Sequence, residues 1–101
     1  MILNFDHKNE INAKKIWLIF QESYTVESKI LKAINFPPLQ RTVSDFLDST
    51  TRFYAFYDKK NICGMIEIDN YGNSTHIQSL VVYPIYFRKG IASKLVSFVL
   101  S

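Results

Sequence analysis

A segment near the end of the chain combines a strand pattern, two cations and a glycine at the start of a helix. An apolar run over 80–82 is followed by Pro84, by Arg88 and Lys89, and by Gly90 before an amphipathic stretch. The first turn of a helix carries backbone N–H groups without partners inside the helix, and these groups attract anions. Glycine allows close approach because it has no Cβ. The spacing therefore suits a phosphate site, but a glycine with two cations alone is more often a solvated basic turn between a strand and a helix.

The wider segment resembles the acetyl-CoA signature of the GNAT N-acetyltransferase superfamily. That signature consists of Gln or Arg, two residues, Gly, one residue, and then Gly or Ala. Gly90 and Ala92 match its small positions, and Arg88 and Lys89 match its usual cations. Phe87 departs from it, because it occupies the Gln or Arg position. The order of helices, three-strand meander and motif also resembles the superfamily, so the likeness covers the chain by topology and is densest over residues 76–100.

The resemblance implies a reaction and a set of binding residues. The reaction is direct transfer of an acetyl group from acetyl-CoA, as co-substrate, to a primary amine, and no metal is expected. The backbone of Leu80, Val81 and Val82 would lie along the pantetheine arm, as an added strand would. The pyrophosphate would be held mainly by the N–H groups of Arg88, Lys89, Gly90, Ile91, Ala92 and Ser93. The identity of the amine acceptor stays open.

Two side chains are candidates for the general base that such a transfer needs, because the amine must be neutral when it reacts. His76 lies eleven residues before Phe87, a spacing at which some lysine-acetylating relatives have a catalytic glutamate. Its ordinary pKa of about 6.5 suits this role. Glu67, on the neighbouring strand, is the second candidate. The simpler account is a solvated histidine at a strand start, and a solvated glutamate on the face opposite Ile66 and Ile68.

Other residues are expected to contribute to the acceptor side or to the oxyanion. Gln78 shares a face with His76 and could orient a substrate or a water molecule. Tyr24 and Phe36 could line an acceptor pocket, with core packing as the simpler account. A strand N–H near Val81 or Val82 would stabilise a developing oxyanion.

The elements that hold these residues predict a mixed α/β (α+β) fold with a mainly antiparallel sheet flanked by helices. Strands are expected over 2–5, 53–57, 62–68 and 76–82. Helices are expected from Asn9 or Asn12 to about Tyr24, over 25–34 before Pro37 and Pro38, after a capping box at 42–45, and over 90–100. Within the third strand, the expected face consists of Ile62, Gly64, Ile66 and Ile68.

Composition narrows the class of protein. A chain of 101 residues with 48% hydrophobic and 21% charged residues can form one folded domain. The net charge of +3 is spread over the chain, so no nucleic-acid patch is expected. No apolar stretch approaches bilayer-spanning length, and no secretory signal is visible, so neither a membrane nor export is expected. The single cysteine, Cys63, excludes an internal disulfide. We expect a cytoplasmic protein.

We expect residues 1–101 to be a single, incomplete acetyltransferase domain. In the superfamily, further strands and a helix follow the third main helix, whereas this chain ends within an apolar helix at residues 98–101. The strand over 76–82 would then have an open edge that favours self-association, and the chain alone would be weakly active. Two alternatives stay open: a non-catalytic acyl-CoA-binding or interaction module, and a protein that binds another phosphate through Arg88 and Lys89.

Overall fold

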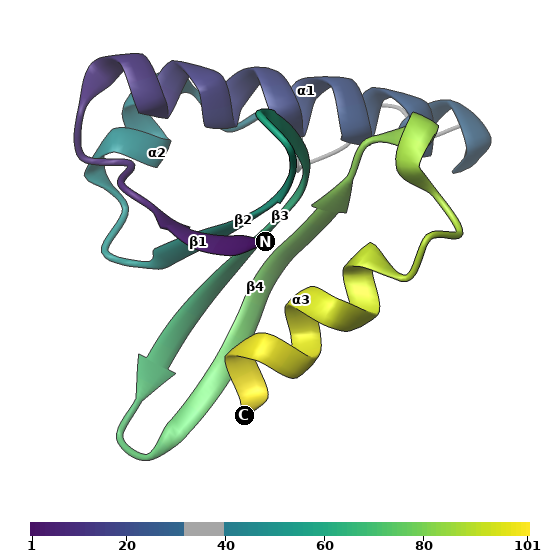
Figure 1. Ribbon diagram of the computed structural model, residues 1–101. Helices are drawn as coiled ribbons and strands as arrows, with labels where there is room; N and C mark the ends of the chain where they lie inside the picture. Colours follow the sequence, from purple (N-terminus) through teal and green to yellow (C-terminus); the bar gives the residue numbers. More distant parts are fainter. Residues whose placement is uncertain (32–39) are drawn as a thin grey trace.

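Four segments rich in β-branched and aromatic residues form one antiparallel sheet in the computed structural model, which describes residues 1–31 and 40–101, and of 26–31 only the backbone. The strands are β1 (Ile2–Phe5), β2 (Arg52–Asp58), β3 (Asn61–Tyr71) and β4 (Ser74–Val82), in the order β1-β2-β3-β4. Every neighbouring pair is antiparallel. Figure 1 shows the long β3–β4 hairpin extending beyond the other strands. The predicted mixed fold with an antiparallel sheet is confirmed.

Helices cover both faces of this sheet. α1 (Glu10–Leu31) and α2 (Val43–Asp48) lie on one face, where their apolar residues pack with Phe53, Ala55 and Met65. α3 (Ile91–Leu100) lies on the other face, where Ile91 and Leu95 pack with Cys63, Ile66 and Ile68 (Figure 1). A short 3-10 turn, η2 (Pro84–Tyr86), connects β4 to α3. In the described part of the chain, no helix is both long enough and apolar enough to cross a bilayer.

The first helix begins where the sequence predicts and continues further. Asn9 caps α1, because its Oδ1 accepts a hydrogen bond of 2.9 Å from the Asn12 N–H. The predicted break between Tyr24 and Thr25 is wrong, since α1 runs through both residues to Leu31. Thr25 is accommodated because its hydroxyl donates to the Gln21 carbonyl one turn earlier. The predicted helix end near residue 34, both prolines at 37–38 and Phe36 lie outside the described residues.

The short helix α2 confirms the predicted capping box. The Asp45 N–H donates to Thr42 Oγ1 over 3.1 Å, and the Thr42 N–H donates to the Asp45 carboxylate over 2.8 Å. Phe46 is fully buried against Phe20 and Phe53. The capping box therefore sets the direction in which Phe46 enters the core.

The predicted face of β3 is correct for three of its four residues. Gly64, Ile66 and Ile68 face α3, whereas Ile62 packs with the α1 side of the core. The register against β2 shifts between Phe56 and Tyr57, which leaves Cys63 as an extra residue in β3. Such a bulge reverses the facing of the residues that precede it.

Gly64 is the point where α3 comes closest to the sheet. A Cβ added there would lie 2.9 Å from the Val81 carbonyl oxygen and 3.2 Å from Ile91 Cγ2 and Val82 Cγ2. One of these contacts involves backbone, which cannot move aside as the end of a side chain can. The lack of a side chain at Gly64 thus allows Ile91, the first residue of α3, to pack against β3.

A buried ion pair joins the start of α2 to β3. Glu67 is 2% exposed, and its two carboxylate oxygens accept hydrogen bonds of 2.7 and 3.1 Å from Arg41. Thr51 Oγ1 donates a third, of 2.7 Å. The Arg41 guanidinium also lies 4.1 Å from the centre of the Phe46 ring. The expectation that Glu67 lies on a solvated face is therefore wrong, although it does lie opposite Ile66 and Ile68.

We expect Gly64→Ala to lower the free energy of unfolding by about 1–3 kcal/mol, because the added methyl group overpacks the contact with α3. Urea denaturation measures this change. Gly72→Asn is the control, because Gly72 has φ +59° in an open turn and Asn tolerates that conformation. A Gly64→Ala variant as stable as the wild type would contradict the tight approach of α3.

We expect Arg41→Met to destabilise the protein by about 2–3 kcal/mol at pH 7, since it leaves the Glu67 carboxylate buried without its cation. Burial raises the pKa of Glu67, but the hydrogen bonds from Arg41 and Thr51 outweigh burial and keep it below its ordinary value. In the wild type this stabilisation is present above the unfolded carboxyl pKa of about 4.3 and is lost as the pH falls below it.

The pH dependence of the variant separates this effect from lost packing. Without Arg41, burial favours the protonated carboxyl, so the stability deficit of Arg41→Met should shrink as the pH falls from 7 toward 4.5. Denaturation curves at several pH values measure the deficit, with the exposed Arg52→Met as control. A deficit that does not change with pH would rule out the charge of Glu67 as its cause.

Candidate functional site

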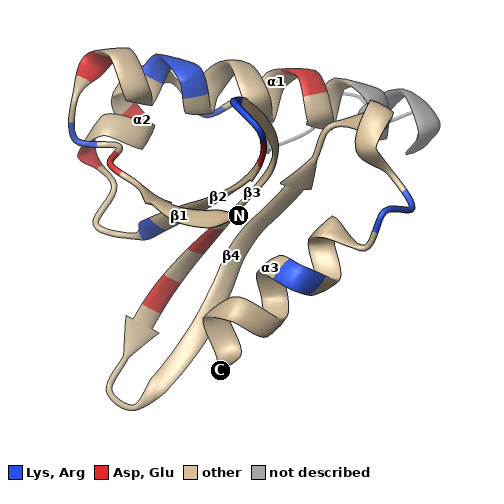
Figure 2. Ribbon diagram, viewed as in Figure 1, with Lys and Arg blue, Asp and Glu red and all other residues tan. Residues whose placement is uncertain are grey.

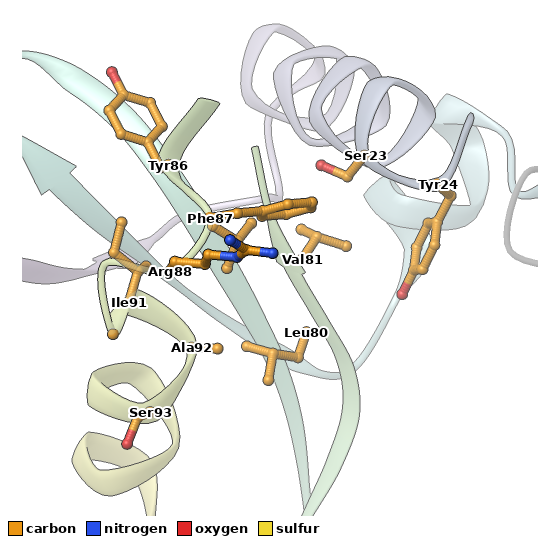
Figure 3. A pocket seen from close by; sticks show the side chains of 12 residues that line it. Ser23, Tyr24, Leu80, Val81, Tyr86, Phe87, Arg88, Ile91, Ala92 and Ser93 are labelled. Carbon is orange, nitrogen blue, oxygen red and sulfur yellow. The ribbon is translucent and has the colours of Figure 1, made fainter. Parts of the chain in front are cut away.

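A pocket of about 680 Å³ surrounds the outer edge of β4 where that strand ends (Figure 3). Its walls come from both faces of the sheet: the C-terminal part of α1 contributes on one side, and η2 and the start of α3 contribute on the other. Eight of the nine residues predicted to bind the coenzyme line this pocket: Leu80, Val81, Val82, Arg88, Gly90, Ile91, Ala92 and Ser93. The fold therefore brings together a strand and a helix start that are separate in sequence.

Lys89 is the ninth residue, and it does not line the pocket. Its Nζ lies 5.5 Å from the centre of the Tyr86 ring instead. Figure 2 shows the basic segment of Arg88 and Lys89 between η2 and α3. Arg88 is the one charged side chain among the described lining residues, so the pocket is apolar with a single cation at its α3 end.

A run of backbone N–H groups is left without acceptors at this end of the pocket. The turn before α3 closes with a bond from the Phe87 N–H to the Pro84 carbonyl, and α3 begins with a bond from the Lys94 N–H to the Gly90 carbonyl. Between them, over residues 88–93, no N–H is bonded to any described residue. Arg88 and Gly90 have φ values of 65° and 74°, and this alternation of conformations curves the chain into an anion-binding concavity.

Gly90 is needed for its conformation rather than for space. Its φ of 74° is in the left-handed region that side chains disfavour. Apart from its own neighbours along the chain, no described residue has an atom within 4 Å of the position that a Cβ would take. The open space beside Gly90 is therefore available to a ligand that the N–H groups of residues 88–93 would hold.

The strand side of the pocket offers backbone as well. β4 is one of the two edge strands among the described strands, and it pairs with β3 through Val81 and Met65 and their neighbours. The outward edge of 80–82 thus has unpaired backbone groups, as an extended ligand chain requires. Phe87 is 50% exposed, and its ring points toward Val81 across the pocket (Figure 3). The departure of Phe87 from the signature puts a ring where a polar side chain is usual.

Neither of the two predicted bases lines the pocket. His76 is exposed near the β3–β4 turn, where its ring packs against Tyr71 with centroids 4.8 Å apart. Four residues of strand, about 13 Å, separate it from Leu80. Glu67 faces α2 in its ion pair with Arg41, and its lowered pKa makes it a weak base. The catalytic roles of His76 and Glu67 stay predictions, and these positions give them no support.

Three further residues line the pocket, and one of them, Ser23, was not predicted from the sequence. Tyr24 lines the pocket and also packs against the core through Phe20, which agrees with the simpler account of this residue. Tyr86 lines the pocket too, and burial raises its pKa. Ser23 was not considered. It is 7% exposed, and its hydroxyl has no hydrogen-bond partner among the described residues. The available signal was its spacing, because Ser23 falls on the apolar stripe of α1, three residues after Phe20.

Comparisons with known proteins agree with this geometry. A family model described as an acetyltransferase (GNAT) domain matches residues 20–101. UPF0157 protein YqkA of Bacillus subtilis (strain 168) is 32% identical over 100 residues, which cover 99% of this chain and 29% of that protein. The chain thus spans less than a third of the length of this curated relative.

Solved structures show the same fold. An aminoglycoside 6′-N-acetyltransferase complexed with coenzyme A has a TM-score of 0.66 at 18% identity, over 98% of this chain and 52% of that one. The PaiA N-acetyltransferase from Thermoplasma acidophilum in complex with coenzyme A has a TM-score of 0.73 at 13% identity, over 98% and 69%. Because the family model matches residues 20–101, which is most of the chain, the chain belongs to the GNAT acetyltransferase family.

Proposed function

We propose that this chain binds acetyl-CoA in the pocket around β4 and takes part in acetyl transfer to a primary amine. The observation that carries the proposal is the run of N–H groups over residues 88–93, which have no acceptor among the described residues and lie at one end of an apolar pocket. A pyrophosphate supplies the acceptors that this run lacks. The two structural relatives complexed with coenzyme A support the same ligand.

Backbone groups and one charged side chain would bind different parts of the coenzyme. The N–H groups of residues 88–93 and the Arg88 guanidinium would neutralise the pyrophosphate. The outer edge of Leu80–Val82 would hold the pantetheine arm through backbone hydrogen bonds, and a strand N–H near Val81 would stabilise developing negative charge on an oxygen. Acetyl-CoA, when bound, supplies the acetyl group as an activated thioester. The apolar residues of the walls would limit the access of water to the thioester.

A second function, a coenzyme-binding module without turnover, is favoured by one observation. Among the described lining residues, none is a carboxylate or an imidazole. Calorimetric titration with acetyl-CoA and with free ADP tests the binding that both functions share, since a site for any phosphate would bind the two comparably. Acetyl transfer to a panel of primary amines then separates them: transfer supports the enzyme, and binding without transfer to any amine supports the module.

We expect Gly90→Val to weaken acetyl-CoA binding more than about tenfold, because it strains the left-handed backbone and places a side chain in front of the N–H groups. The Kd from calorimetry measures this change, with the thermal midpoint recorded to check folding. Gly72→Val is a matched control, since Gly72 also has a positive φ and open surroundings but lies in the β3–β4 turn. Equal binding by both variants would contradict the assigned pyrophosphate site.

We expect His76→Ala to keep the Kd for acetyl-CoA within about twofold of the wild type, because the imidazole lies outside the pocket. Acetyl transfer by the same variant tests the predicted base, which requires a fall of about 10²-fold or more. A smaller fall with intact binding would exclude His76 as the base. A weakened Kd would contradict the position of His76 outside the binding site.

A further inference from the structure

Ser23 is a buried hydroxyl that the proposed function has not used. Its side chain belongs to a residue only 7% exposed, and its Oγ has no hydrogen-bond partner among the described residues. It is also part of the pocket wall. Buried polar groups in folded proteins are nearly always hydrogen-bonded, so an exception that faces a pocket points to a ligand.

The neighbouring helix turn shows that the missing bond is specific to Ser23. A serine or threonine within a helix can satisfy its hydroxyl by donating to the carbonyl four residues earlier. Thr25 does this, with the Gln21 carbonyl as acceptor. Ser23 makes no such bond, although the carbonyl of Ile19 is at the equivalent position. The two hydroxyls are therefore a contrasting pair on one helix.

The position of Ser23 indicates which part of a ligand it would contact. The N–H groups of residues 88–93 lie at the α3 side, whereas Ser23 lies on α1, on the opposite wall, and its hydroxyl points inward (Figure 3). A ligand held at its diphosphate by residues 88–93 presents its far end toward α1. The lining between these two walls includes the apolar side chains of Val81 and Phe87, where an added hydrogen bond has few competitors.

We propose that Ser23 Oγ donates a hydrogen bond to the acyl carbonyl oxygen of the bound coenzyme thioester. This inference rests on the proposed function, because it takes the diphosphate to be held at residues 88–93. It assigns to Ser23 recognition of the acyl group, as distinct from recognition of coenzyme A as a whole. The hydroxyl that has no protein partner would then be satisfied by the ligand.

The test compares acetyl-CoA with free coenzyme A, which lacks the acyl carbonyl. Calorimetry on wild type and on Ser23→Ala yields a Kd for each ligand. We expect Ser23→Ala to weaken acetyl-CoA binding about three- to tenfold relative to coenzyme A, as the loss of one neutral hydrogen bond implies. Thr25→Ala, which removes the hydroxyl already bonded to Gln21, is the matched control and should leave the ratio of the two Kd values unchanged.

The unliganded protein supplies an independent measurement. Ser23→Ala removes a buried polar atom without a partner, so we expect its thermal midpoint to be equal to or higher than that of the wild type. A lower midpoint would show that the hydroxyl already has a partner within the protein, which overturns the inference. Because Ser23→Ala removes only one hydroxyl group, we expect the variant to fold, so its binding can be measured.

Each binding result decides the question. A selective loss of affinity for acetyl-CoA in Ser23→Ala alone supports the proposal. An equal loss for both ligands overturns it, since the hydroxyl would then contact the pantetheine arm that they share. Unchanged Kd values for both ligands also overturn it, because the Ser23 hydroxyl would then contact neither of them and would be left for the amine acceptor. Wild-type protein that binds neither ligand would overturn the proposed function along with the inference, and that result differs from all the others.

Discussion

The approach of α3 to β3 at Gly64 is the constraint on which the rest of the structure depends. Ile91 Cγ2 and the Val81 carbonyl oxygen lie 3.2 and 2.9 Å from the position that a Cβ at Gly64 would take. This contact brings the first turn of α3 beside the last residues of β4. The N–H groups of residues 88–93 and the free edge of β4 share one pocket as a result. A larger residue at position 64 would separate the two, because packed interiors leave little room for an added methyl group.

The opposite face of the sheet is held by charge rather than by a close backbone approach. Glu67, Arg41 and Thr51 bring together β3, the start of α2 and the segment before β2. The ion pair costs desolvation, and the third hydrogen bond and the stacking of Arg41 on Phe46 help to offset that cost. This network stabilises the face that α1 also covers. Since α1 carries Ser23 and Tyr24, the network supports the pocket wall opposite α3 from a distance.

Local patterns predicted the elements that local physics determines. Asn9 and the capping box at Thr42 were identified because each bonds to residues three positions away. The helix start at Gly90 was identified from another local feature, a glycine directly before an amphipathic stretch. The surroundings of Glu67 were not predicted, because its partner Arg41 lies 26 residues away and no periodicity reports such a pairing. The bulge at Cys63 also escaped prediction, since it depends on how β3 pairs with β2.

The pocket relies on backbone where the family signature allows a side chain, and this explains how Phe87 is tolerated. A ring at that position can donate nothing to a phosphate, but the N–H groups of residues 88–93 do not depend on the side chain of residue 87. The ring instead adds apolar surface facing Val81 (Figure 3). In such surroundings a hydroxyl on the far wall gains importance, because a hydrogen bond strengthens as the local dielectric constant falls. Phe87 therefore removes a polar side-chain contact at the phosphate end of the ligand. By making the pocket more apolar, it also strengthens the hydrogen bond proposed for Ser23 at the acyl end.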